Sequence, residues 1–139
     1  MRTQSLVFLL SLAAGCHENE PGPAMVASLS GEELAKAKCA SCHDPDGDGS
    51  YSGGTDSVVE GGMVFAANLS PDPNTGLGEW SEKQMLTAIQ SGIDDEGLSL
   101  CSTMPRWRNQ LTDDEALMIV DFLRSLKPID KEIPESMCD

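Results

Sequence analysis

Two cysteines and a histidine lie close together in the first third of the chain, at Cys39, Cys42 and His43. Thiolates and imidazoles are nucleophiles and metal ligands, so this cluster is the place where the sequence is best equipped for chemistry. The spacing Cys-x-x-Cys-His is the attachment signature of c-type haem, in which both sulfurs bond the porphyrin and the histidine binds the iron. We therefore predict one covalent haem c on these three residues.

Two other kinds of site use similar residues and are kept as the alternative, a non-haem zinc or redox module. A structural zinc site needs four such ligands. The cluster supplies three, and the other histidine, His17, is near the N-terminus, so Cys101 or Cys138 would have to provide the fourth. A thioredoxin-like pair would need a preceding buried strand, whereas residues 31–38 indicate a short helix.

The second axial ligand of the iron is predicted to be a methionine, since the sequence has no third histidine. Most of the methionines fall inside predicted amphipathic helices or near the chain ends, which leaves Met104 and Met63 as loop candidates. Met104 is followed by Pro105, and this rigid turn can hold a thioether at a fixed reach. We predict that Met104 binds the iron, with Met63 as the alternative. A thioether opposite His43 raises the reduction potential relative to a second imidazole.

The remaining cysteines are predicted to have other roles. Residues 1–15 read as a signal peptide, and the segment ending at Cys16 is similar to a bacterial lipoprotein signal in which that cysteine is acylated. Ordinary secretory cleavage is the alternative. Both interpretations export the chain, so we expect the bacterial periplasm or cell envelope, with residues 16–28 as a tether to the membrane through the lipid. Cys101 and Cys138 then remain as a pair and are expected to form a disulfide.

Three capping boxes predict where helices begin, because Ser or Thr is followed three residues later by Glu or Gln. They are Ser30 with Glu33, Ser81 with Gln84, and Thr112 with Glu115. We expect the second helix to end at Gly92 and the third before Pro128. Residues 44–79 contain many Gly, Pro, Asp, Asn and Ser and predict no strand. Residues 29–139 are therefore expected to form one all-α domain, with about three main helices and long loops around the haem.

The chain is strongly acidic, with a formal net charge of −14 over 139 residues. This charge excludes nucleic acid as a partner. It favours encounter with proteins that present basic docking surfaces. The alternative is that the charge only keeps the protein soluble.

The acidic segment from Asp44 to Gly49 copies the first half of a calcium-binding loop, with acids at the first, third and fifth positions and Gly at the sixth. The twelfth position is Thr55 instead of the bidentate Glu that such loops use. We therefore interpret this segment as a solvated acidic turn, and calcium binding as its alternative.

These features together resemble the class I c-type cytochromes, specifically the bacterial single-haem domain of periplasmic carriers and of dehydrogenase cytochrome subunits. The resemblance covers roughly residues 31–126, and its motifs are specific together and weak apart. The motifs are Cys39–His43, Asn68–Ser81, Thr103–Pro105 and Ile119–Leu126. The family implies a cytochrome c fold in which the first and last helices cross, with His43 and Met104 on the iron. Ala35 departs from the family, because this position in the crossing is commonly aromatic; the crossing would then be looser or would be carried by Phe122.

The resemblance implies an electron carrier that performs no bond chemistry and has no small-molecule substrate. Trp80 is placed like family residues that approach a haem propionate, or else it serves as a helix staple. Arg106 and Arg108 are candidates for neutralising propionates or steering a partner, against an ordinary surface role. The alternatives are a cytochrome subunit of a membrane dehydrogenase complex, or a peroxidase-like haem enzyme if Met104 does not bind iron.

Overall fold

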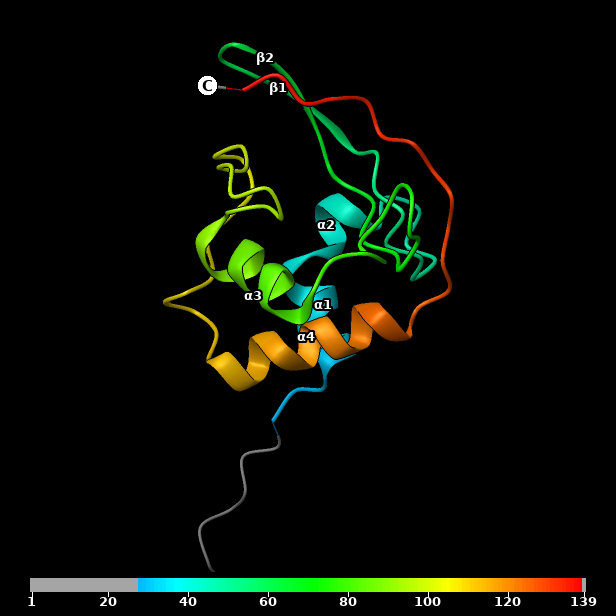
Figure 1. Ribbon diagram of the computed structural model, residues 1–139, viewed down its shortest axis with the longest axis vertical. Helices are drawn as coiled ribbons and strands as arrows, with labels where there is room; N and C mark the ends of the chain where they lie inside the picture. The colour runs from blue at the N-terminus through cyan, green and yellow to red at the C-terminus, as the bar shows by residue number, and fades with distance from the viewer. Residues whose placement is uncertain (1–27, 139) are drawn as a thin grey trace, which may run out of the picture.

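The computed structural model describes residues 28–138. In this range the chain forms four helices and one small sheet, and long loops follow α2, the sheet and α3 (Figure 1). The elements in chain order are α1 (Gly31–Lys38), α2 (Ala40–His43), β1 (Asp56–Val59), β2 (Gly62–Phe65), α3 (Glu82–Ser91) and α4 (Asp113–Ser125). The prediction of a mostly helical domain with three main helices is confirmed, and α2 is an additional single turn.

Each main helix begins with the capping box that the sequence predicts. The side chain of the N-cap residue accepts a hydrogen bond from the backbone N–H three residues later, and the Glu or Gln at that position accepts one in return. These bonds pair backbone donors that a helix start otherwise leaves free. Helix α3 is followed by Gly92 in the left-handed conformation, with φ 67°. The predicted helix limits are therefore confirmed.

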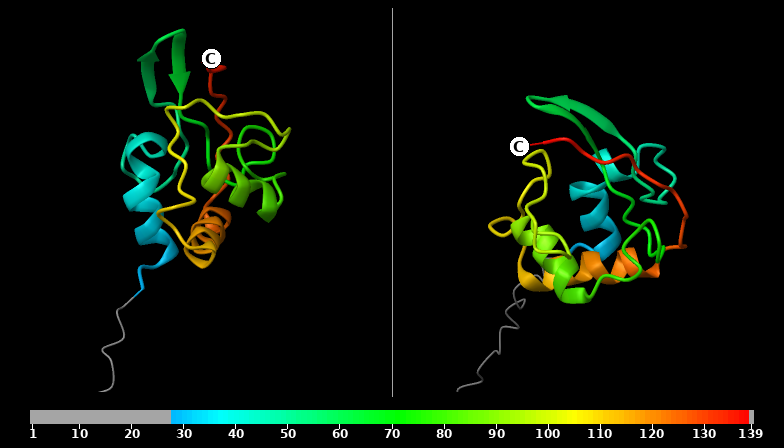
Figure 2. Two further views of the ribbon diagram at one scale, coloured as in Figure 1. Left: turned by 90° about the vertical axis from the view of Figure 1, so that its left-hand side faces the viewer. Right: turned by 45° about the horizontal axis from the view of Figure 1, so that its top comes forward.

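Helices α1 and α4 cross at the centre of the core (Figures 1 and 2). Their backbones approach closely because small residues lie at the contact. A Cβ on Gly31 would overlap the backbone carbonyl of Met118 in α4, and Ala35 and Ala116 are each 0% exposed. The crossing thus has the small-residue geometry in which a larger side chain would push the helices apart.

The aromatic contact that Ala35 does not supply comes from a loop. The ring of Tyr51 packs edge-on against Phe122 of α4, with the two ring centroids 5.6 Å apart. Such edge-to-face pairs are favourable beyond the area that they bury. A long-range pair therefore fills the space beside the helix crossing.

The prediction that residues 44–79 contain no strand is wrong. Strands β1 and β2 form an antiparallel hairpin, with pairs running from Asp56 with Phe65 to Val59 with Gly62. Three of the four residues in β1 are exposed, so the hairpin lacks the alternation of buried and exposed positions by which a half-buried strand is recognised. Its tight turn includes Gly61 at a φ of 97°, a conformation that favours glycine.

The segment after α4 runs back across the molecule and ends beside this hairpin (Figure 1; Figure 2, left). The backbone N–H of Met137 donates to the carbonyl of Met63, with 2.8 Å between N and O. The backbone N–H of Phe65 donates to Ser136 Oγ, also at 2.8 Å. This C-terminal tail, residues 127–138, therefore adds irregular contacts to the open side of β2.

The predicted signal peptide at residues 1–15 and the proposed lipid site at Cys16 lie outside the described residues. Within residues 28–138, no helix has the length and apolar character needed to cross a bilayer. The mode of membrane attachment therefore stays a prediction.

Replacing Gly31 by Ala tests the helix crossing. The new methyl group would meet the Met118 backbone, which cannot rotate away, so α1 and α4 would have to separate. We expect a loss of about 1–3 kcal/mol in the free energy of unfolding, as in other overpacked cores, and a greater loss for Gly31→Val. Thermal unfolding of the haem-loaded protein measures the effect. The control is Ala37→Ser on the exposed face of α1; equal melting temperatures for the control and Gly31→Ala would contradict the packing.

Candidate haem-binding site

The predicted attachment residues lie where α1 passes into α2. Cys39 caps both helices, and its carbonyl accepts a hydrogen bond from the backbone N–H of His43 at 2.9 Å. Cys39 is buried and Cys42 is exposed, and neither is part of a disulfide. The single turn thus keeps both thiols free within one short segment, as covalent attachment of one porphyrin requires.

His43 is buried, and one hydrogen bond fixes its ring. Its Nδ1 lies 2.8 Å from the backbone oxygen of Ala67, and since a carbonyl can only accept, Nδ1 carries the proton. The lone pair is then on Nε2, which is the form in which an oriented histidine binds a metal. Burial lowers the pKa of His43, while the Ala67 bond opposes that change. The neutral ring is therefore favoured.

The loop that presents the Ala67 carbonyl is held by Asn68, which is 2% exposed. The Asn68 amide donates to the Ile129 carbonyl at 2.8 Å and to Thr75 Oγ1 at 3.2 Å. Its oxygen accepts from the backbone N–H of Ser70 at 3.0 Å. All of these groups are at least partly shielded from water, so the network specifies one loop conformation.

Asp72 closes the next turn of the same loop. Its carboxylate accepts from the backbone N–H groups of Thr75 at 2.8 Å and of Asn74 at 3.0 Å. The hydrogen bond from the Thr75 backbone is the main cause of a lowered pKa at Asp72. A Cβ on Gly76 would overlap the Ser70 carbonyl. The residue types of the Asn68–Ser81 motif are therefore explained by a backbone that folds tightly on itself.

The two methionine candidates occupy different surroundings. Met104 is half-buried in the loop between α3 and α4, and its backbone N–H donates to the Cys101 carbonyl at 3.0 Å. Met63 lies on β2, paired with Val58, and its carbonyl holds the C-terminal tail. A strand residue with partners on both sides has little freedom to move toward another site. These positions favour Met104, which stays a prediction.

Cys101 and Cys138 form a disulfide in the structure, with their Cα atoms 5.7 Å apart. Cysteine counting predicts the same pair. The bond joins the loop that carries Met104 to the tail that packs on β2. It therefore connects two segments that are separated in sequence by 37 residues.

The three residues considered as propionate contacts, Trp80, Arg106 and Arg108, make other contacts in the structure. Trp80 packs against the core, partly buried, and its backbone carbonyl accepts from Arg124 at 3.0 Å. Arg106 directs its guanidinium at carbonyls of the Met104 loop. Arg108 donates to Ser91 Oγ at 2.9 Å and is exposed. The packing of Trp80 is compatible with a hydrophobic staple at the start of α3. A haem contact by Trp80 or Arg106 stays a prediction.

Trp107 is a candidate that the sequence analysis misses. Its indole N–H is buried and has no hydrogen-bond partner among the described residues. The ammonium group of Lys38, next to Cys39, lies 4.7 Å from the centroid of the indole ring. An unpaired buried donor is costly, and the carboxylate oxygens of a haem are acceptors that could satisfy it. The sequence gives only a weak signal, an aromatic residue two places after Pro105.

These features fit a haem c. The fit rests on two free thiols within one turn, on a buried imidazole whose Nδ1–H is already used, and on the unpaired donor of Trp107. Residues Cys39, Cys42 and His43 would hold the group. Met104 is the candidate for the second protein ligand of the iron.

The acidic turn at Asp44–Gly49 is closed by its own carboxylates. Asp44 Oδ2 accepts from the Gly49 N–H at 3.1 Å, and Asp48 Oδ1 accepts from the Ser50 N–H at 2.9 Å. In the part of the chain that the structure describes, no cluster of three or more His, Cys, Asp or Glu side chains could hold a metal ion. The turn is therefore held by local hydrogen bonds, although Asp44 Oδ1 is buried without a partner among the described residues, and the choice between a solvated turn and a calcium site stays a prediction.

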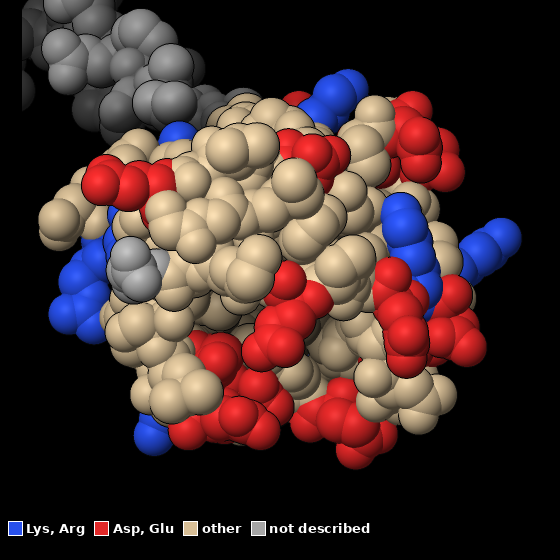
Figure 3. Space-filling model, turned by 90° about the horizontal axis from the view of Figure 1, so that it is seen from above, with Lys and Arg blue, Asp and Glu red and all other residues tan. Residues whose placement is uncertain are grey.

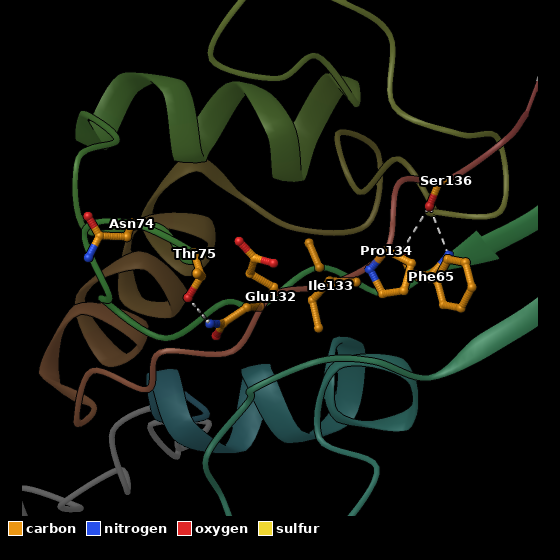
Figure 4. Close-up of a pocket in the computed structure, with 9 residues that line it drawn as sticks. Phe65, Asn74, Thr75, Glu132, Ile133, Pro134 and Ser136 are labelled. Atoms are coloured by element: carbon orange, nitrogen blue, oxygen red, sulfur yellow. Dashed lines mark hydrogen bonds between the residues drawn. The ribbon is translucent and has the colours of Figure 1, made fainter.

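An open pocket of about 520 Å³ lies between the Ala67 loop and the C-terminal tail (Figure 4). Within it the hydroxyl of Ser136 points at the backbone of Phe65, and Thr75 meets the amide nitrogen of Asn68. None of the predicted haem ligands lines this pocket. We interpret it as the seam along which the tail packs.

Comparison with known proteins adds independent evidence. A family model described as Cytochrome c matches residues 28–127. This range contains the attachment cluster, the loop that carries Ala67 and Asn68, and the Met104 loop. The similarity therefore extends over all of the candidate site.

Similar proteins include cytochrome and other subunits of bacterial dehydrogenases. A nicotinate dehydrogenase subunit of Pseudomonas putida is 32% identical over 107 residues, which cover 75% of this chain and 9% of that protein. The gluconate 2-dehydrogenase cytochrome c subunit of Pantoea cypripedii is 29% identical, over 75% of this chain and 25% of its own length. The fructose dehydrogenase cytochrome subunit of Gluconobacter japonicus is 29% identical, over 98% of this chain and 29% of its own length. The chain thus spans less than a third of the length of each of these relatives.

Replacing Asn68 by Ala tests the network that supports the Ala67 carbonyl. The substitution leaves the Ser70 N–H without its partner and removes the shortest of the three hydrogen bonds that the Ile129 carbonyl accepts. We expect a loss of about 1–3 kcal/mol in the free energy of unfolding, the usual cost of an unsatisfied buried group. Thermal or denaturant unfolding of the haem-loaded protein measures it. Asn74→Ala, at an exposed position of the same loop, is the matched control, and equal stability of the two variants would contradict this role.

Asp72 makes the stability of this loop dependent on pH. Because hydrogen bonding lowers the pKa of Asp72 in the folded state, its contribution is complete above the unfolded value of about 3.9. It is lost as pH falls through the lower folded pKa. Asp72→Asn should therefore lower the melting temperature at neutral pH, and the difference from wild type should shrink below about pH 4. Exposed Asp121→Asn is the control; a pH-independent difference for Asp72→Asn would refute the assignment.

Proposed function

Because this chain belongs to the cytochrome c family, we propose that it is a one-electron carrier with a single haem c on Cys39, Cys42, His43 and Met104. The observation that carries the proposal is the hydrogen bond from His43 Nδ1 to Ala67, which leaves Nε2 for the iron. When bound, the haem would supply one iron that alternates between the ferrous and ferric states. The number of haems follows from the one Cys-x-x-Cys-His motif in the sequence.

The residues of the chain hold this centre without taking part in bond chemistry. The sulfurs of Cys39 and Cys42 anchor the porphyrin, and Ala67 fixes the His43 ring against rotation. Met104 would supply a thioether to the iron, which would raise the reduction potential and keep exchangeable ligands out. Unchanged ligation in a packed site keeps rearrangement small during electron transfer, which suits a carrier.

An acidic docking surface supports a basic redox partner. On the face that carries the hairpin and the chain end, acidic side chains are spread over the surface and are densest in the lower part of the view (Figure 3). Exposed acids include Glu60 in the hairpin turn, Asp95 and Glu96 in the loop between α3 and α4, and Glu135 in the tail. A field of this sign attracts basic protein surfaces and weakens with added salt.

A permanent subunit of a dehydrogenase complex is the second candidate function. It is favoured by the names of the relatives, which include cytochrome subunits of gluconate and fructose dehydrogenases. The two candidates differ in whether the chain remains bound to a catalytic subunit when it is purified from its own organism. The haem chemistry is the same in both.

Export to the bacterial periplasm or cell envelope is part of the proposal. Support comes from the signal-like residues 1–15, from Cys16 and from the disulfide, which persists in oxidising compartments. Acylation of Cys16 would tether the domain to a membrane, with residues 16–28 as the spacer. Intact mass of natively matured protein reports the acyl chains and the attached haem together.

The axial ligand is tested by Met104→Ala in the natively matured, haem-loaded protein. We expect a lower reduction potential and ready binding of carbon monoxide to the reduced form, because the substitution removes the thioether. Met63→Ala is the matched control and should change neither property. The reverse pattern would move the ligand to Met63. Properly exported protein that is colourless, with Cys39 and Cys42 still open to alkylation, would end the haem assignment.

A further inference from the structure

The loop between α3 and α4 has an ordered first half. Gly92 leads into a short turn in which Ile93 pairs with Ser99 and the carboxylate of Asp94 accepts from the Leu98 N–H at 2.7 Å. The N–H of Leu100 then donates to the Gly92 carbonyl at 2.9 Å. The chain is therefore brought back to the end of α3 just before Met104.

Arg106 holds the second half of this loop. Its guanidinium donates to the carbonyls of Leu100 at 2.6 Å and of Cys101 at 2.9 Å, and also to the carbonyl of Met104. Two of these carbonyls precede Met104 in the sequence, and the third belongs to Met104 itself. A planar guanidinium presents several donors at fixed angles, so one side chain can bind all three oxygens.

Gly92 provides the surface on which this guanidinium lies. A Cβ at position 92 would overlap the Nε and Cζ atoms of Arg106. Gly92 also has a positive φ, which ends α3. Absence of a side chain at this residue therefore serves both the helix end and the close approach of the arginine.

The disulfide secures the loop from its other side. Cys101, whose carbonyl binds Arg106, is bonded to Cys138 at the end of the tail. Arg106 acts within the loop, whereas the disulfide joins the loop to the remainder of the fold. The loop is thus held both by hydrogen bonds within it and by a covalent bond to the tail.

We propose that Arg106 is a positioning residue that holds the Met104 thioether in place by binding the three loop carbonyls. This role rests on the proposed function, in which Met104 binds the iron. It differs from the expectation that Arg106 neutralises a propionate, because its two terminal nitrogens are directed at the backbone. Without Arg106 the loop would open more often and expose the iron to other ligands.

The test measures binding of imidazole to the ferric, haem-loaded protein. An added ligand competes with Met104, so its apparent affinity reports how often the loop is open. Arg106→Gln should raise that affinity about tenfold or more, because it removes charge-assisted hydrogen bonds. Arg106→Lys keeps the charge but not the planar set of donors, so it should rescue little. Arg108→Gln, which removes an equal charge two residues away, should bind imidazole as the wild type does.

A cycle with Met104→Ala separates this inference from the proposed function. If Arg106 acts through Met104, Arg106→Gln should add nothing to imidazole binding in the Met104→Ala protein. An equal increase in both backgrounds would overturn the positioning role, and so would wild-type affinity in Arg106→Gln and Arg106→Lys. If Met104→Ala alone leaves the absorption spectrum unchanged, the ligand assignment itself fails. If Arg106→Gln does not mature, Arg106→Lys decides the question.

Discussion

The hydrogen bond between His43 and Ala67 is the interaction on which the site depends. The attachment cluster is local in sequence, because Cys39, Cys42 and His43 lie within five residues. The direction of the imidazole, however, is set by a carbonyl 24 residues away. A histidine with a free ring could rotate or protonate, whereas one that donates from Nδ1 keeps Nε2 available to a metal. The small motif therefore works only inside a fold that holds the Ala67 carbonyl.

The C-terminal tail links the loop next to Ala67 to the loop that carries Met104. Near its beginning, the Ile129 carbonyl accepts a hydrogen bond from the side chain of Asn68, the residue that follows Ala67. Its end contacts β2 through Met137 and joins the Met104 loop through Cys138. One segment thus contacts both the loop next to Ala67 and the loop that carries Met104. Long loops with few hydrophobic contacts gain their order from such cross-links, because neither loop could cover the cost of its own conformational entropy.

The parts of this structure that the sequence predicts are local ones. A capping box needs only two residues three apart, so Ser81 with Gln84 could be recognised without knowledge of the fold. The β1–β2 hairpin could not, since most of β1 faces solvent and has no apolar alternation. The roles of Trp107 and Arg106 depend on which distant backbone atoms surround them, and residue type alone does not reveal that. Ala67 is the hardest of these residues to identify from the sequence, because it contacts His43 through its backbone oxygen and its side chain plays no part.

The core explains why a cofactor is expected at its centre. At the crossing of α1 and α4, Gly31 lets the two backbones approach, and the buried Ala35 and Ala116 contribute little side-chain volume. Only 4% of the residues are aromatic, and Trp107 buries a donor without a partner among the described residues. A domain of this size buries a limited fraction of its surface, so a large apolar group with acceptor oxygens would add both the missing contacts and the missing hydrogen bond. The same packing that stabilises the fold would then hold the iron in constant surroundings, which is the condition for fast electron transfer without chemistry.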